Sequence, residues 1–284
     1  MTGTSPTVRQ RELGKRLREL RNQHKLTVED VAGRLLCSAT KMSRLETGAR
    51  RPSLRDVRDL CVLYELDEQD SAELMSLARR AREPGWWTRY DDVRLDPYIG
   101  LETAATAITA YSMYYVPALL QTEEYAAALI KAVAPHISPD AYRQRIEIRL
   151  RRQQLLEQDN RPRYRVLLDE AVLRRGVGGV DAMARQLGKI IDAADGGRVT
   201  VQVIPFEVGA HAAQDSNFVL LEFDREPSLS PVVFVEGLTG NQYIERRADV
   251  ARYRDAIERL RDSGLNPHDS LQRVDQLRET FSRE

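Results

Sequence analysis

Residues 26–53 read LTVEDVAGRLLCSATKMSRLETGARRPS and contain two short helical patterns separated by a few residues. Thr27 lies directly before the first pattern, and Asp30 follows three residues later. This spacing is typical of a capping box in which Asp replaces the usual Glu or Gln, so it predicts that a helix begins here. The apolar residues of this helix recur at helical spacing and are Val28, Val31, Ala32 and Leu35.

The second helical pattern begins at Ser38, a residue type that caps helix N-termini. Met42 and Leu45 lie three residues apart and are predicted to face the core, and Gly48 is predicted to end the helix. The pattern therefore predicts a short helix over residues 38–47. Two short helices joined by a tight turn are typical of a helix-turn-helix.

Further helical patterns flank this motif on both sides. One helix is predicted over residues 7–24, and apolar residues continue at helical spacing after the motif to about Arg82. A Pro-Gly pair at residues 84–85 then interrupts the pattern. We therefore predict an all-α helix-turn-helix domain over residues 1–82 and a second domain over residues 83–284.

The composition argues against several classes of protein. No apolar run approaches the roughly 18 residues that a membrane-spanning helix needs, and the first 20 residues lack an apolar signal segment. Neither membrane association nor secretion is therefore expected. Two cysteines, Cys37 and Cys61, favour a reduced cytoplasmic protein, and no further Cys or His lies near them at metal-site spacing. We expect no metal site.

The overall net charge of zero conceals an uneven distribution of charge. Residues 1–58 hold 14 Lys and Arg against 6 Asp and Glu, a net charge of +8, so the remainder of the chain carries −8. A basic head on an acidic body is typical of a nucleic-acid-binding module joined to a different module. Chance clustering would give the same asymmetry, so charge alone does not decide the function.

The stretch over residues 26–53 resembles the DNA-binding domain of the phage-repressor and Cro-like class, the XRE family. The resemblance covers about residues 13–66, and its most specific part is SRLETG followed by RPS. It implies that Glu46 is structural, because in the family pattern this acid pairs with a basic residue near the end of the first helix. Arg21 is the matching position, and the alternatives are Arg16 and Arg18.

A DNA major groove admits an α-helix, whose N-terminal residues then meet the base edges. Arg44 and Lys41 can donate hydrogen bonds to guanine, whereas Ala39 offers only a methyl contact to thymine. The two arginines of the following loop are expected to hold phosphate groups, and Thr27 at the start of its helix offers a second phosphate anchor. The predicted contacts to double-stranded DNA are Thr27, Ser38, Ala39, Thr40, Lys41, Ser43, Arg44, Arg50 and Arg51.

The periodicity changes in the second domain. Three helices are predicted over residues 98–113, 122–133 and 138–158, and two more over residues 248–262 and 270–282. Four segments are predicted as strands because they are rich in β-branched and aromatic residues: RYRVLLD, VTVQVIPF, NFVLLEF and PVVFVEG. The predicted fold class is therefore α+β, with an N-terminal helix-turn-helix bundle and a C-terminal mixed domain whose sheet of about four strands is flanked by helices.

Candidate catalytic residues in the second domain are few. Asp169 and Glu170 follow a strand and could form an acid pair, but Asp169 is also a good cap for the next helix, which we favour. His211 has no Ser or Cys nucleophile beside it, and the glycines at 176–179 do not follow a strand as a phosphate-binding loop requires. We predict no catalytic set and no cofactor, and therefore no enzyme.

The second domain resembles the uncharacterised domain that follows this type of helix-turn-helix in regulators of filamentous high-GC bacteria. Its sharpest segments are VPALLQT and LDEAVLRR, and the resemblance covers nearly all of residues 86–282. The resemblance implies an antitoxin-like transcriptional regulator that binds a small partner protein encoded by a neighbouring gene. Residue spacing alone does not indicate such a partner.

Three functions remain open at this stage. The first is a sequence-specific transcriptional regulator whose second domain forms a homodimer or binds a partner protein. The second is an antitoxin-like protein whose main role is to sequester the small partner. The third is an enzyme or a small-molecule sensor, for which a polar pocket around Glu170, His211 and Glu236 would be the evidence.

Overall fold

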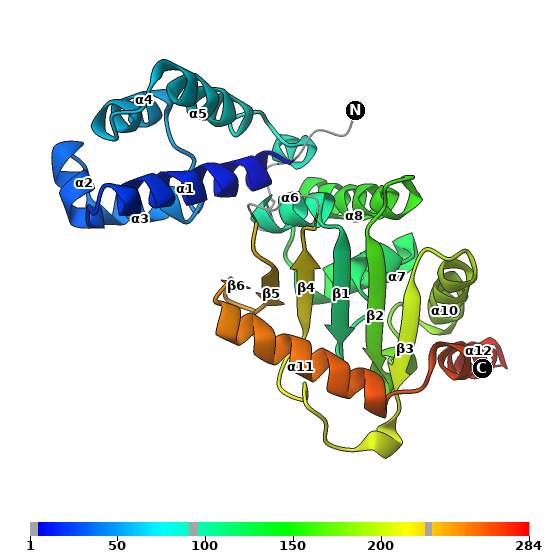
Figure 1. Cartoon of the computed structure of the whole chain (residues 1–284). Helices are drawn as coiled ribbons and strands as arrows, with labels where there is room; N and C mark the ends of the chain where they lie inside the picture. The colour runs from blue at the N-terminus through cyan, green and yellow to red at the C-terminus, as the bar shows by residue number, and fades with distance from the viewer. Residues whose placement is uncertain (1–4, 91–95, 225–228, 284) are drawn as a thin grey trace. The chain divides into compact units, whose positions relative to one another are not determined.

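The computed structural model describes residues 5–90, 96–224 and 229–283 (Figure 1). These residues separate into two compact units. Among the described residues, the first contains 5–89, 96–104 and 229, and the second contains 90, 105–224 and 230–283. Helices build the first unit, and a sheet with helices builds the second, so the predicted α+β fold class is confirmed.

Five helices form the bundle of the first unit. They are α1 (Pro6–Gln23), α2 (Val28–Arg34), α3 (Ala39–Glu46), α4 (Leu54–Leu63) and α5 (Glu68–Arg80). The helix-turn-helix is the α2–α3 pair. The apolar positions of all five helices meet in one core that includes Leu13, Leu17, Val31, Met42, Leu45, Val57, Leu60, Leu74 and Leu77.

The short 3-10 helix η1 (Trp86–Arg89) and helix α6 (Asp96–Ala104) also belong to the first unit. The sequence boundary at residue 83 assigned both to the second domain. Gly100 of α6 lies so close to α1 that a Cβ atom at this position would lie 2.1 Å from the Oγ1 atom of Thr7. This contact gives the reason why α6 groups with the helical bundle.

Three helices of the bundle end at residues with a left-handed backbone, namely Lys25, Leu36 and Glu65. At the end of α2, Leu36 has a φ of 51°, and the N–H of Cys37 donates to the carbonyl of Ala32 at 2.9 Å. This is the Schellman pattern, in which glycine usually takes the left-handed position. Leu36 is 94% exposed, so a strained apolar residue marks the turn before α3.

The second unit contains a six-stranded sheet in the order β3-β2-β1-β4-β5-β6. β1 pairs with β2 in parallel and with β4 in antiparallel orientation, so that Ala110 lies opposite both Val166 and Val219. β2 and β3 are also parallel, and β4, β5 and β6 are successive antiparallel neighbours. The strands are β1 (Ala107–Ser112), β2 (Arg163–Asp169), β3 (Thr200–Ile204), β4 (Phe218–Glu222), β5 (Val232–Glu236) and β6 (Asn241–Ile244).

The four predicted strands correspond to β2, β3, β4 and β5, whereas β1 and β6 were not predicted. The helix predicted over residues 98–113 is wrong after Ala104, because the segment AITAYS forms the central strand β1. All six residues of β1 are buried, so the strand lacks the alternation of apolar and polar residues that a half-buried strand shows. β6 is a short edge strand with the polar sequence NQYI, which carries no strand signal.

The helices of the second unit cover both faces of this sheet, and Figure 1 shows α11 (Arg247–Ser263) crossing one of them. Val250, Ile257 and Leu260 of α11 pack against apolar side chains of the sheet. The other helices are α7 (Glu123–Val133), α8 (Pro139–Gln153), α9 (Glu170–Arg174), α10 (Val180–Asp195) and α12 (Pro267–Arg283), with the 3-10 turns η2 (Ala118–Leu120), η3 (Gln154–Glu157) and η4 (Phe206–Val208). None of the helices described is long and apolar enough to cross a bilayer.

The chain itself closes the β3 edge of the sheet. The N–H of Val203 donates to the hydroxyl of Ser270, and the carbonyl of Val203 accepts from the N–H of Leu265, both at 2.9 Å. The segment between α11 and α12 therefore occupies backbone groups that would otherwise pair with another strand.

Candidate nucleic-acid interface

Helix α3 presents one face to the core of the bundle and the other to solvent. Met42 and Leu45 are fully buried, as the sequence predicts, and the hydroxyl of Ser38 accepts a hydrogen bond from the N–H of Lys41 at 3.1 Å. Gly14 of α1 permits α3 to approach closely, because a Cβ there would lie 2.6 Å from the carbonyl oxygen of Leu45. The inner face of α3 is thus fixed by packing and by its cap.

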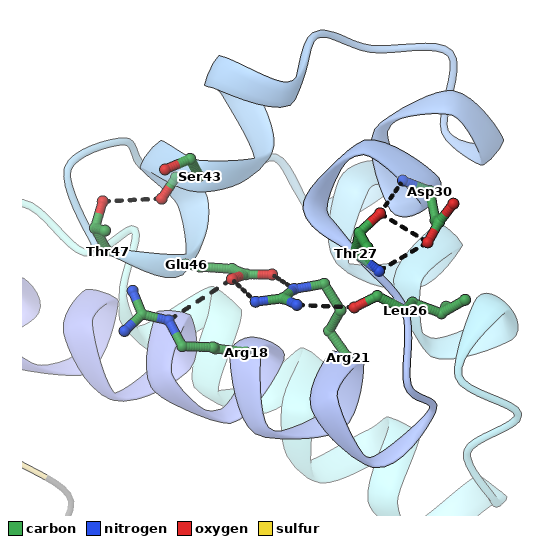
Figure 2. A network of polar contacts seen from close by, with 8 residues as sticks. All are labelled: Arg18, Arg21, Leu26, Thr27, Asp30, Ser43, Glu46 and Thr47. Atoms are coloured by element: carbon green, nitrogen blue, oxygen red, sulfur yellow. Dashed lines mark hydrogen bonds and ion pairs between the residues drawn. The ribbon is translucent and has the colours of Figure 1, made fainter.

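An ion pair fixes the end of α3 to the end of α1 (Figure 2). Arg21 donates from Nε to Oε1 of Glu46 at 2.7 Å and from Nη2 to Oε2 at 3.0 Å, and it also donates to the carbonyl of Leu26 at 2.8 Å. The Glu46 side chain is only 2% exposed, and Arg18 lies 3.7 Å from the same carboxylate. The structure therefore pairs Glu46 with the position that the family pattern implies, while Arg18 contributes at its edge.

Thr40, Ser43 and Arg44 lie on the exposed face of α3. In the part of the chain that the structure describes, no hydrogen bond or ion pair engages the guanidinium group of Arg44. The side chains of Thr40 and Ser43 are likewise without a partner among the described residues. This face therefore offers one cation and two hydroxyl groups to a ligand.

Lys41, in contrast to Arg44, is held in an ion pair. Its Nζ atom lies 2.6 Å from Oδ1 of Asp56 in the first turn of α4, and both side chains are about three-quarters buried, with 26% and 21% exposure. The prediction that Lys41 reaches guanine therefore requires that this ion pair break. In the free protein Lys41 instead ties α3 to α4.

The first helix of the motif has a complete capping box. The N–H of Asp30 donates to Oγ1 of Thr27, while both the N–H and the hydroxyl of Thr27 donate to the Asp30 carboxylate at 2.8 and 2.7 Å. These hydrogen bonds lower the pKa of Asp30, so a negative charge is held at the N-terminus of α2. A phosphate group at Thr27 would have to displace this carboxylate, which argues against the predicted anchor.

Ala39 is half-buried and packs against the core of the bundle. Its methyl group is therefore partly occupied by the protein, which limits the predicted contact with thymine. Among the predicted contacts in α3, the exposed residues at positions 40, 43 and 44 remain the best placed.

The loop after α3 is tied down at both ends and exposed in the middle. The amide of Gln10 donates to the carbonyl of Gly48 at 2.7 Å, and Arg82 donates to the carbonyl of Pro52 at 3.3 Å. Arg50 and Arg51 are exposed, and neither side chain has a partner among residues 5–90, 96–224 and 229–283. The backbone of this loop is therefore positioned while its two guanidinium groups stay available to phosphate.

Two further arginines were missed by the sequence analysis. Arg34 is an exposed residue in the last turn of α2, and Arg55 is 83% exposed in the first turn of α4, beside the Asp56 that holds Lys41. Arg55 lies only 3.6 Å from Asp59, one turn further along α4. The sequence feature that could have identified Arg55 is its position four residues after Arg51. A basic loop and the start of the helix that follows it can contact the same phosphate backbone.

The acidic and histidine candidates of the second unit do not form the pocket considered from the sequence. Glu170 is buried and pairs with Arg174 and with Arg273, whose Nη1 atom is 2.8 Å away. Glu236 instead accepts a hydrogen bond from the hydroxyl of Tyr115 at 2.7 Å. Asp169 caps α9 by accepting from the N–H of Ala171 at 2.8 Å, which fits the favoured reading of this residue.

Comparison with known protein families found two matching family models. A family model described as a helix-turn-helix domain matches residues 12–74, which include α2, α3 and the Arg21–Glu46 pair. The first unit thus has the motif, the capped outer helix and the unpaired cations of a DNA-binding regulator.

A second family model matches residues 95–276, which is more than half of the chain. The chain belongs to the family that this model defines, described as a domain of unknown function (DUF5753). No curated protein and no solved structure was found to match the chain.

Proposed function

We propose that the protein is a sequence-specific transcriptional regulator that inserts α3, within the predicted recognition segment 38–47, into the major groove of double-stranded DNA. In this proposal Arg44 reads guanine, Thr40 and Ser43 contact bases or phosphates, and Arg50 and Arg51 hold the backbone. The protein acts by binding and has no catalytic step. The proposed contacts follow the pattern of XRE-type helix-turn-helix proteins.

The observation that carries this proposal is the contrast between the two faces of α3. The inner face is locked by buried Leu45 and by the buried carboxylate of Glu46, whereas Arg44, the residue before Leu45, is exposed and has no partner among the described residues. The backbone of a rigidly packed helix loses little further conformational entropy on binding, so the side chains on its exposed face are presented in a fixed arrangement, which favours specific recognition.

The test is selection of DNA by the purified full-length chain. Genomic fragments that it retains at moderate salt should share a sequence motif, and the Arg44→Ala protein should retain fragments without that motif or none at all. Arg79→Ala is the matched control, because Arg79 is an exposed residue of α5. Its substitution removes the same charge and leaves α3 unchanged. Random fragments retained alike by all three proteins would refute sequence-specific binding.

We also propose that the second unit mediates association, either as a homodimer or with a small partner protein in the manner of an antitoxin. Two features support this. β6 lies at the edge of the sheet, opposite the closed β3 edge, and Leu238 between β5 and β6 is 92% exposed. Large exposed apolar side chains and edge strands are common sites of association.

Sedimentation of the full-length chain and of its Leu238→Glu variant tests this second proposal. A wild-type dimer that the variant weakens would support self-association. A wild-type monomer that co-purifies in a defined ratio with the product of a neighbouring gene would support the partner. A monomer that binds no such product would contradict both versions.

A further inference from the structure

The second unit contains a cavity of about 310 Å³ that is open to solvent. Its lining comes from three neighbouring strands at the ends where they leave the sheet: Met113 and Tyr114 after β1, Asp169 at the end of β2, and Pro205 after β3. These three strands are parallel, so their carboxyl ends meet at one edge of the sheet. The cavity therefore occupies the position where open α/β sheets commonly bind small molecules.

The floor of this cavity is a polar cluster that is already satisfied by the protein. His211 is only 4% exposed, and its Nδ1 atom accepts a hydrogen bond from the N–H of Ala213 at 3.3 Å. Its Nε2 atom lies 3.2 Å from the hydroxyl of Tyr111 and 3.6 Å from Oδ2 of Asp169. The Asp169 carboxylate accepts a hydrogen bond from the N–H of Ala171 at 2.8 Å.

The rim of the cavity, in contrast, has polar groups that the protein leaves unused. Arg175 is exposed and directly follows α9, and within the described residues its guanidinium group has neither a hydrogen bond nor an ion pair. The side-chain amide of Gln214 is also exposed, and it has no partner among the described residues. The positive charge of Arg175 at this cavity therefore has no counterion among the residues described.

Two aromatic rings line the same cavity as Arg175. Phe206 and Tyr114 line the cavity and are 55% and 51% exposed, which is unusual for side chains of this size. The guanidinium carbon of Arg174 lies 5.7 Å from the centre of the Phe206 ring, so the ring is held by a cation–π contact rather than by burial. Exposed rings and an unpaired guanidinium group that line one cavity suit a ligand that is planar at one end and anionic at the other.

We propose that this cavity is a binding site for a small aromatic organic anion, whose carboxylate or phosphate pairs with Arg175 while its ring packs against Phe206 and Tyr114. The volume suits a molecule of the size of a substituted benzoate or a nucleoside and is at the lower end of the range for ligand pockets. The proposal does not depend on DNA binding, because all residues that carry it lie in the second unit.

Binding can be measured by NMR on the full-length chain with labelled histidine side chains, using benzoate as the probe. Benzamide serves as its neutral counterpart, and inorganic phosphate as an anion without a ring. The signal of His211, assigned with variants of the other three histidines, reports occupancy of the cavity. Benzoate is expected to move this signal, and benzamide and phosphate to bind at least about 10-fold more weakly, as expected when a charge-assisted hydrogen bond or the ring contact is lost.

Two variants separate specific binding from general attraction. Arg175→Gln is expected to weaken benzoate binding by about 10-fold or more, as loss of one charge-assisted hydrogen bond predicts. Arg161→Gln removes the same charge at an exposed position just before the opposite end of β2, and it should bind as the wild type does. Equal binding by the two variants, equal binding of benzoate and benzamide, or no movement of the His211 signal would each overturn the proposal.

Discussion

Arg21 and Glu46 form a bidentate ion pair that joins the last turn of α1 to the last turn of α3, with donor–acceptor distances of 2.7 and 3.0 Å. Hydrogen bonding to Glu46 raises the pKa of Arg21, so the guanidinium group is held in its charged form. The pair therefore sets the position of α3 from inside the bundle, while Arg44, two residues before Glu46 in the same last turn, is exposed to solvent.

Removing one partner of this pair should destabilise the first unit strongly. Arg21→Met leaves the 2%-exposed Glu46 carboxylate without its main partner, so we expect a loss of about 3 kcal/mol in the free energy of unfolding. The double variant Arg21→Met, Glu46→Leu should recover much of this loss, because no buried charge remains. Urea unfolding of the wild type, Arg21→Met, Glu46→Leu and the double variant measures the coupling, and additive losses would show that the pair is not a unit.

Two Gly→Ala substitutions in the first unit are expected to change stability in opposite directions. Gly14→Ala places a methyl group against the Leu45 carbonyl, so it should lower stability by about 1–3 kcal/mol through overpacking. Gly33→Ala adds a methyl group at an exposed helical position with no atom within 4 Å, and it should raise stability by about 0.5–1 kcal/mol. Thermal unfolding distinguishes the two, and a change in the same direction for both would contradict the packing described.

The turn of the helix-turn-helix should become more stable when Leu36 is replaced by glycine. A left-handed backbone costs an L-residue about 1–2 kcal/mol, and glycine loses about 0.5–1 kcal/mol through extra freedom in the unfolded chain, so the expected net gain is about 0.5–1 kcal/mol. Lys25→Gly, at the equivalent end of α1, is the matched comparison. A lower melting temperature for Leu36→Gly would indicate that the leucine contributes a contact that its exposure conceals.

The Lys41–Asp56 pair predicts a pH effect and a DNA-binding effect. Burial alone would raise the pKa of Asp56, but hydrogen bonds from Lys41 and Ser53 outweigh it and hold the pKa below the ordinary value of 3.8. Because the folded-state pKa is depressed, Asp56 stabilises the fold above the ordinary pKa, and this contribution is lost as the pH falls through the lower folded value. Asp56→Asn should therefore be less stable than the wild type at neutral pH and approach it in strong acid.

The same substitution releases Lys41 and removes a negative charge beside α3. Asp56→Asn should consequently bind DNA more tightly and steepen the dependence of log K on log salt by about 0.9, the value for one further phosphate contact. Fluorescence anisotropy at several salt concentrations measures this slope. An unchanged slope would mean that Lys41 stays away from the duplex even when it is free.

The sequence predicted the parts of this molecule that local rules control. Caps at Thr27 and Ser38 and inward residues such as Met42 depend on neighbours within one or two turns, and the structure has them as expected. β1 was missed because burial on both faces removes the periodicity that identifies a strand. The partner of Lys41 lies 15 residues away on another helix, and only the packing of α3 against α4 brings Asp56 to it.

The cavity beside His211 could likewise not be predicted from local sequence patterns. Its residues come from three loops that the sheet brings together, so no local spacing in the sequence could indicate them. The sequence did single out His211, but the two acids considered with it have other partners. The acid that lies near it is Asp169, which the sequence favoured as a helix cap and did not connect with His211.

Base preference of the Arg44→Ala variant tests the central claim most directly. Binding should be measured by anisotropy on a retained DNA fragment and on derivatives that change one base pair at a time, alongside Arg51→Ala. We expect Arg44→Ala to lose about 1–3 kcal/mol and to become indifferent to one base pair, whereas Arg51→Ala should weaken all fragments alike and reduce the salt slope by about one. If Arg44→Ala kept the affinity and every base preference of the wild type, α3 would not be the recognition helix.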